Sequence, residues 1–69
     1  MEVTINKEEK LNLTEEDFKD YEEVREGGLT NMFDVRRVVE LSDNLTEEKV
    51  KAIMNNYEAL IKEFPNVRN

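Results

Sequence analysis

The chain has 69 residues, close to the lower limit for a domain that folds alone, so we expect one small core and a single domain over residues 1–69. It contains no cysteine and no histidine, which excludes disulfides, thiolate or imidazole metal sites, and the side chain that most often transfers protons near neutral pH. The formal charge of −7, from 17 acidic against 10 basic residues, disfavours free nucleic acid as a partner because phosphate binding depends on clustered Lys and Arg.

The hydropathy of the chain is typical of a folded protein outside membranes. Hydrophobic residues make up 38% of the sequence, and they recur with a regular period, which argues against disorder. Residues 1–7 lack the apolar run of a signal peptide, and no later stretch is long enough to cross a bilayer. We therefore expect a cytoplasmic protein without a membrane partner.

The first 13 residues carry two short alternating patterns. Val3 and Ile5 alternate with polar neighbours, and so do Leu11 and Leu13. Such alternation is typical of half-buried strands, so residues 1–13 form either a short β-hairpin or a partly ordered arm. The connection between the two patterns has no glycine, and an isolated hairpin is marginal in water, so a hairpin would have to pack on the helices or pair with another chain.

A Leu-Thr pair precedes each of three segments with helical character: Leu13-Thr14, Leu29-Thr30 and Leu45-Thr46. A threonine at the N-cap accepts a hydrogen bond from a free amide of the first turn, which stabilises a helix by about 1 kcal/mol. Thr14, followed by Asp17 three residues later, and Thr46 are therefore predicted N-caps. For the middle helix, Thr30 and Asn31 compete as the cap.

Three helices follow from these starts. The first is predicted over residues 15–26, and Gly27-Gly28 ends it because glycine readily adopts the left-handed conformation of a helix C-cap. The second, over residues 31–42, is apolar around most of its circumference and is predicted to be the most buried. The third, over residues 47–64, has the clearest 3.6-residue period and ends before Pro65.

The predicted fold class is therefore mainly α. It is a three-helix domain over residues 14–64, with residues 1–13 as the hairpin or arm and residues 65–69 as a loose tail. Because the apolar stripes of the three helices must face one another, they define the predicted core, which consists of Phe18, Tyr21, Val35, Val39, Ile53, Tyr57 and Leu60.

The sequence offers little for catalysis. It has no histidine or cysteine nucleophile and no glycine-rich phosphate loop followed by lysine. The acidic residues of the first helix lack the apolar surroundings that shift a carboxyl pKa for acid–base chemistry, and no segment has the alternating oxygen ligands of a calcium loop. We expect no enzyme activity, no cofactor and no metal.

The strongest functional signal is the charge of residues 15–26, where seven acidic residues stand against Lys19 and Arg25, a local net charge of −5. A row of carboxylates can dock on a basic protein surface, and it can also serve solubility alone. Arg37 of the second helix can pair with an acid of the first helix or with a partner. The predicted partner-binding residues are Glu15, Glu16, Glu22, Glu23 and Arg37.

Two alternatives use other surfaces. The second and third helices have the spacing of a helix-turn-helix DNA-binding regulator. The third helix, which would read the DNA, opens with Glu47 and Glu48, and these carboxylates would repel phosphates. The DNA contacts would come from Lys49, Lys51, Asn55 and Asn56. The other alternative is a homodimer that buries apolar surface left over from the second or third helix.

Residues 21–35, YEEVREGGLTNMFDV, resemble short, uncharacterised proteins encoded by bacteriophages and prophages of Gram-positive bacteria. The segments VELS at residues 39–42 and IMNNY at 53–57 extend the resemblance, whose most specific part is Thr-Asn-Met-Phe-Asp. It implies a phage or prophage origin and a bacterial cytoplasm, without a reaction. We therefore expect a small accessory protein that binds a host or phage protein. Met32 and Phe33 within this motif either close the end of the bundle or form an exposed anchor.

Overall fold

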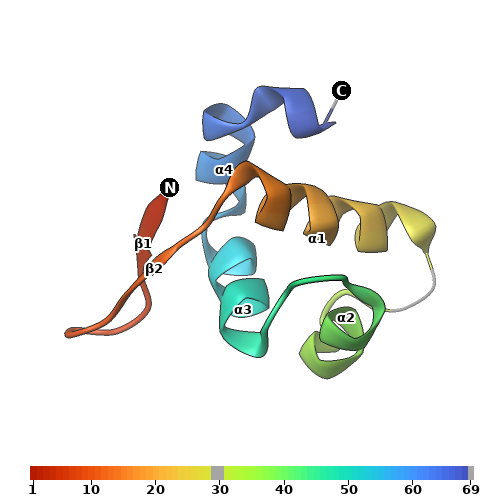
Figure 1. Ribbon diagram of the computed structural model, residues 1–69, viewed down its shortest axis with the longest axis horizontal. Helices are drawn as coiled ribbons and strands as arrows, with labels where there is room; N and C mark the ends of the chain where they lie inside the picture. Colours follow the sequence, from red (N-terminus) through yellow and green to blue (C-terminus); the bar gives the residue numbers. More distant parts are fainter. Residues whose placement is uncertain (29–30, 69) are drawn as a thin grey trace.

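The computed structural model describes residues 1–28 and 31–68 (Figure 1). The predicted mainly α fold is confirmed, but these residues form four α-helices rather than three, after an N-terminal hairpin. Within the same residues, no helix is long and apolar enough to cross a membrane. In chain order the elements are β1 (Glu2–Thr4), β2 (Lys10–Asn12), α1 (Glu15–Gly27), α2 (Val35–Leu41), α3 (Glu47–Asn55), α4 (Tyr57–Glu63) and the 3-10 helix η1 (Pro65–Arg68).

The first residues adopt the hairpin alternative. β1 and β2 pair antiparallel, with Val3 opposite Leu11. The turn without glycine is organised by Asn6, whose Oδ1 accepts hydrogen bonds at 2.9 Å from the backbone N–H groups two and three residues later. An asparagine side chain in this arrangement substitutes for part of a backbone turn. Val3 and Leu13 are buried in the core, which supplies the packing that an isolated hairpin lacks.

α1 begins and ends where the sequence predicts. The Oγ1 of Thr14 accepts a hydrogen bond from the Asp17 N–H, and the Oδ2 of Asp17 accepts one from the Thr14 N–H, each at 3.1 Å. This reciprocal pair is a complete capping box. At the other end Gly28 has φ +65°, a left-handed conformation that glycine adopts without the steric penalty of a Cβ.

The predicted helix over residues 31–42 is shortened to α2 at its N-terminal end. Its N-cap is Asp34, whose Oδ1 accepts a hydrogen bond from the Arg37 N–H at 3.2 Å. Thr30, one of the two predicted caps, lies outside the described residues. Only Val38 is buried among the described residues of α2, so the prediction that this is the most buried helix is wrong.

The predicted helix over residues 47–64 begins at its predicted cap but is interrupted at Asn56. Thr46 Oγ1 accepts a hydrogen bond from the Lys49 N–H at 3.2 Å. Asn56 has φ −121° and ψ 22°, and its Nδ2 donates a hydrogen bond to the carbonyl oxygen of Ala52 at 2.8 Å. A side chain that bonds to the helix backbone competes with regular helix geometry, and the chain divides here into α3 and α4.

The C-terminal residues are more ordered than predicted. Residues 65–68 form η1 rather than a loose tail, and the N–H of Val67 donates to the carbonyl oxygen of Phe64 at 3.3 Å. Val67 packs partly buried against the core. η1 lies beside α1 and closes that side of the molecule (Figure 1).

Hairpin and helices share one core, with α1 at its centre. α1 contacts α2, α3 and η1, and Figure 1 shows α2 and α3 on one side of it and η1 on the other. Phe18, Ile53 and Leu60 are completely buried, as predicted, and Tyr21 is nearly so. The other predicted core residues, Val35, Val39 and Tyr57, pack at the edge of this core and are only partly buried.

Candidate protein-binding surface

The acidic residues of α1 fall into two groups. Asp17, Asp20 and Glu22 are buried, and each bonds to a different part of the chain. The remaining four are exposed and lie on the outer side of the helix: Glu15, Glu16, Glu23 and Glu26. Only the exposed group is available to a partner that approaches the folded protein.

Asp20 connects α1 to the loop between α2 and α3. Its carboxylate accepts hydrogen bonds from the N–H of Asp43 at 3.0 and 3.1 Å and from the N–H of Asn44 at 2.8 Å. A buried carboxylate with several donors satisfies both itself and the loop amides. Asp20 therefore holds the chain in position just before α3 begins.

Asp17 connects α1 to α3 through Lys49. The Nζ of Lys49 lies 3.1 Å from the Oδ1 of Asp17. Burial of the Asp17 carboxyl favours a higher pKa, but the hydrogen bond from the Thr14 N–H and the ion pair with Lys49 outweigh it, and the pKa lies below its ordinary value. Lys49, one of the predicted DNA contacts, is therefore engaged in an ion pair that joins α3 to α1.

Glu22 lies inside the protein, although the sequence predicts it as a partner-binding residue. Only 2% of its surface is exposed. The Tyr57 Oη donates a hydrogen bond to Glu22 Oε1 at 2.6 Å, and the Nε of Arg25 donates to the other carboxylate oxygen. The ring of Tyr57 also meets Phe18 edge to face, with 5.6 Å between ring centroids. Glu22 consequently does not belong to the exposed acidic face.

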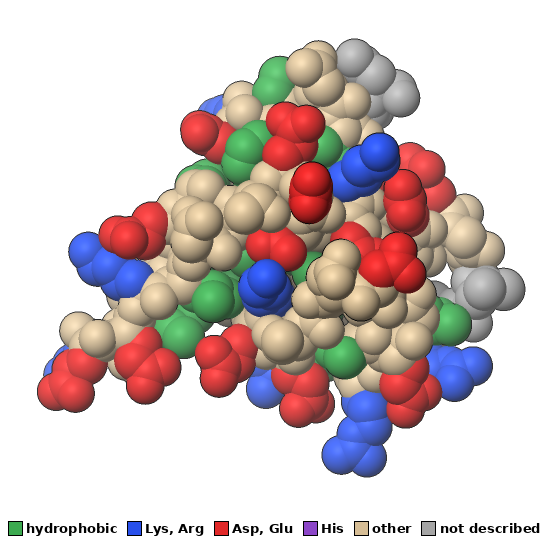
Figure 2. Space-filling model, in the orientation of Figure 1, with side chains coloured by type: hydrophobic (Ala, Val, Ile, Leu, Met, Phe, Trp, Pro, Cys, Tyr) green, Lys and Arg blue, Asp and Glu red, His purple; other side chains and the backbone are tan. Residues whose placement is uncertain are grey.

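The exposed acidic face consists of Glu15, Glu16, Glu23 and Glu26, with Lys19 among them. Figure 2 shows several acidic side chains over the part of the molecule that α1 occupies. Three of the predicted partner-binding residues, Glu15, Glu16 and Glu23, thus have the exposure that the prediction requires.

The residues before α2 resolve the alternatives for Met32 and Phe33. Met32 packs partly buried against the core, whereas Phe33 is 81% exposed. The turn that carries them is held by Asn31, whose Oδ1 accepts a hydrogen bond from the Phe33 N–H and whose carbonyl oxygen accepts one from the Asp34 N–H, each at 2.9 Å. Phe33 is therefore presented to solvent on a hydrogen-bonded turn.

Both arginines of α2 are exposed. The Nη1 of Arg37 pairs with the Oε2 of Glu40 at 3.1 Å, rather than with an acid of α1. Arg36 forms no ion pair within residues 1–28 and 31–68. Phe33, Arg36 and Arg37 together are called the Phe33 surface below.

A groove of about 260 Å³ separates the C-terminal half of α1 from the end of α2. Carboxylate oxygens of Asp20, Glu23 and Asp43 lie within 4.8 Å of one another at this groove. Hard cations prefer such oxygens, but both oxygens of Asp20 already accept amide hydrogen bonds. The three carboxylates lie close together because Asp20 binds the backbone amides of the α2–α3 loop, which carries Asp43. The α1–α2 groove, as it is called below, is lined by Asp20, Glu23, Val24, Gly27, Leu41 and Asp43.

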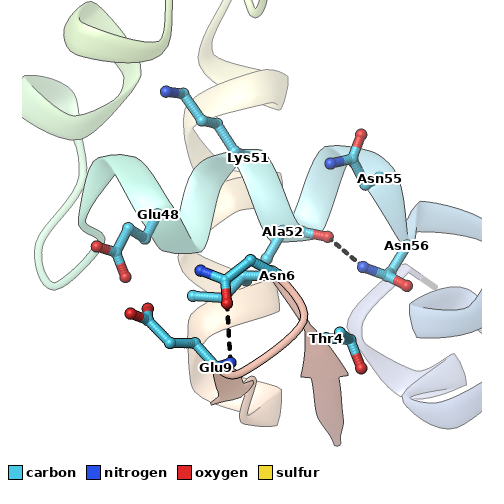
Figure 3. Close-up of a pocket in the computed structure, with 9 residues that line it drawn as sticks. Thr4, Asn6, Glu9, Glu48, Lys51, Ala52, Asn55 and Asn56 are labelled. Atoms are coloured by element: carbon cyan, nitrogen blue, oxygen red, sulfur yellow. Dashed lines mark hydrogen bonds between the residues drawn. The ribbon is translucent and has the colours of Figure 1, made fainter.

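α2 and α3 are consecutive helices in contact, as the helix-turn-helix alternative requires, but Lys49, one of its predicted DNA contacts, pairs with Asp17. A second cleft of about 320 Å³ lies between α3 and the hairpin, and Lys51, Asn55 and Asn56 line it together with the two carboxylates of Glu9 and Glu48 (Figure 3). Figure 3 shows the Glu9 and Glu48 carboxylates on the hairpin side of α3, whereas the Lys51 side chain points away from them. Carboxylates at this cleft are unfavourable for contact with phosphates. The geometry thus gives little support to the predicted DNA contacts.

Comparisons with known proteins produce no match: no protein-family model, curated protein or solved structure is significantly similar to this chain. Its function must therefore be inferred from its own residues.

Proposed function

We propose that this chain is a non-catalytic accessory protein of phage or prophage type that binds a protein partner through the Phe33 surface. The observation that carries this proposal is the 81% exposure of Phe33. Other large hydrophobic side chains in the described residues are at least partly buried. A phenyl ring in solvent is unfavourable, and its burial in a partner would release the water around it.

The neighbours of Phe33 support the same proposal. Aromatic residues and arginine are enriched in the buried centres of protein interfaces, and Arg36 and Arg37 follow Phe33 closely in the chain. Because the Asn31 side chain already holds the turn, little backbone freedom would be lost on binding. The Phe33 surface is thus largely organised before a partner arrives.

The exposed acidic face has a second role in the proposal. Glu15, Glu16 and Glu23 would accelerate the approach of a partner with a basic surface and repel nucleic acid. The resemblance of residues 21–35 to phage and prophage proteins supports action in the bacterial cytoplasm, on a host or phage protein.

The test is affinity purification of the tagged protein from a nuclease-treated bacterial lysate, with wild type and Phe33→Ser compared in parallel. We expect wild type to retain a stoichiometric protein partner that the variant loses. A matched control is Lys51→Ser, which changes an exposed residue of α3 rather than a member of the Phe33 surface. Equal recovery of the same proteins by wild type and Phe33→Ser would contradict the proposal.

Charge steering is tested separately with Glu15→Lys/Glu16→Lys. Because exposed charges act over about 10 Å at 0.1 M salt, this variant should bind the same partner with a slower association rate at low salt. The difference should disappear at high salt. Identical association rates at low salt would remove the acidic face from the proposal and leave the Phe33 surface.

A further inference from the structure

The same chain carries an open groove with room for an aromatic side chain. The α1–α2 groove has a volume of about 260 Å³, and Val24 and Leu41 contribute apolar surface to it. A protein cavity of about 150 Å³ is large enough to bind benzene, so the groove has room for a phenyl ring. Phe33 does not fill the groove of its own chain, because its side chain is exposed to solvent.

The groove and the Phe33 surface also differ in charge. Glu23 and Asp43 lie at the groove, and neither forms an ion pair within residues 1–28 and 31–68. No lysine or arginine of the described part of the chain lines it. Arg36, three residues after Phe33 in the chain, likewise forms no ion pair within these residues. Each surface therefore has unpaired charges that the other could neutralise.

We propose that Phe33 of one copy enters the α1–α2 groove of a second copy, with Arg36 facing Glu23 and Asp43. This inference rests on the proposed function, because it names the partner of the Phe33 surface as the chain itself. Two reciprocal contacts close a twofold dimer, whereas contacts in one direction produce open chains. Self-association would also brace a core of a size that rarely suffices alone.

Sedimentation equilibrium over a concentration series tests the contact directly. Wild type should associate reversibly. Phe33→Ser, which removes the ring, and Glu23→Lys/Asp43→Lys, which reverses the groove charge, should each weaken association at least tenfold, equivalent to about 1.4 kcal/mol. The matched control Glu58→Lys/Glu63→Lys makes the same charge change on two exposed residues of α4 and should not weaken it.

Mixing the variants distinguishes a specific contact between Phe33 and the α1–α2 groove from nonspecific association. An equimolar mixture of Phe33→Ser with Glu23→Lys/Asp43→Lys should recover part of the association. One variant keeps the groove and the other keeps the ring, so one of the two contacts can form. Within one chain, Glu23→Lys combined with Arg36→Glu should associate more tightly than either single variant. Circular dichroism of each variant checks that the helices are retained.

The outcomes separate this inference from the proposed function. A wild type that stays monomeric but captures a lysate protein through Phe33 overturns self-association and leaves the proposed function intact. Association that is independent of Phe33 also overturns the inference. Association that requires Phe33 and recovers in the mixture supports it, even where no lysate protein is captured. A wild type that stays monomeric and captures no lysate protein through Phe33 overturns both the inference and the proposed function.

Discussion

The hydroxyl of Tyr57 donates a 2.6 Å hydrogen bond to the buried carboxylate of Glu22, which lies 35 residues earlier in the chain. This bond joins the start of α4 to the middle of α1. Asp17 and Asp20 make comparable connections from α1 to Lys49 and to the α2–α3 loop. The acidic character of α1 is therefore partly structural, since three of its carboxylates connect it to α3, to the α2–α3 loop and to α4.

Removal of the Tyr57 hydroxyl should destabilise the fold. Tyr57→Phe keeps the ring and its contact with Phe18 but takes a donor from the buried carboxylate of Glu22, a loss of about 1–3 kcal/mol for a buried polar group. Urea unfolding measures the change. Tyr21→Phe is the matched control, because the Tyr21 hydroxyl makes no hydrogen bond to the described residues. Equal effects of the two substitutions would show that the Tyr57–Glu22 bond contributes nothing specific.

Asp20 should matter more to stability than its neighbour Glu23. Asp20→Ala leaves the N–H groups of Asp43 and Asn44 without their acceptor, with an expected loss of about 1–3 kcal/mol in the free energy of unfolding. The exposed Glu23→Ala should change it by less than about 0.5 kcal/mol. Amide hydrogen exchange of residues 43 and 44 should also become faster in Asp20→Ala. Unchanged exchange would contradict the capping role.

The Asp17 carboxyl should make stability depend on pH in the acid range. Its pKa in the folded protein lies below the ordinary value of 3.8. Its contribution is therefore fully present above pH 3.8 and is lost as pH falls through the folded pKa. The difference in unfolding free energy between wild type and Asp17→Asn should be constant near neutral pH and shrink below pH 3.8. Urea unfolding at a series of pH values checks this, and a difference that does not shrink in acid would contradict it.

The two adjacent glycines should respond to alanine in opposite directions. Gly27 is the last residue of α1, and a Cβ there would meet no atom within 4 Å, so Gly27→Ala should stabilise the protein by up to about 1 kcal/mol. Gly28 has φ +65°, where a Cβ costs roughly 1–2 kcal/mol. Gly28→Ala should therefore lower the thermal midpoint and Gly27→Ala should raise it. A thermal midpoint that Gly28→Ala does not lower would contradict the left-handed cap.

Signals that act over a few residues were sufficient to predict part of the fold. Thr14, Thr46 and Gly28 cap their helices through atoms within four positions of themselves, so their roles are visible in the sequence. The α2 start and the break at Asn56 are also local, but they depend on which of several polar side chains bonds to the backbone. Propensity and apolar periodicity do not decide that competition.

The candidate site shows more clearly what could not be predicted from the sequence. Glu22 and Glu23 are identical and adjacent, yet one is buried and the other exposed. The difference is set by Tyr57, a residue of another helix. The sequence does not show that Tyr57 contacts Glu22, so both glutamates were predicted as binding residues. One local signal was available, since Glu22 lies four residues after Phe18 and so falls on the same side of the helix. The exposure of Phe33 had no comparable signal, because an apolar residue at a helix start packs inward as readily as outward.

The phenylalanines provide the clearest test of which aromatic residue serves the fold and which serves a partner. Phe18 is completely buried and Phe33 is 81% exposed. Phe18→Ala should lower the unfolding free energy by about 3–5 kcal/mol, because it leaves a cavity in the core. Phe33→Ser should change it by less than about 0.5 kcal/mol, since no core contact is lost. Urea unfolding of both variants at a concentration where the chain is monomeric makes the comparison. A large loss of stability in monomeric Phe33→Ser would mean that the ring serves the fold, and its effect on binding would then be indirect.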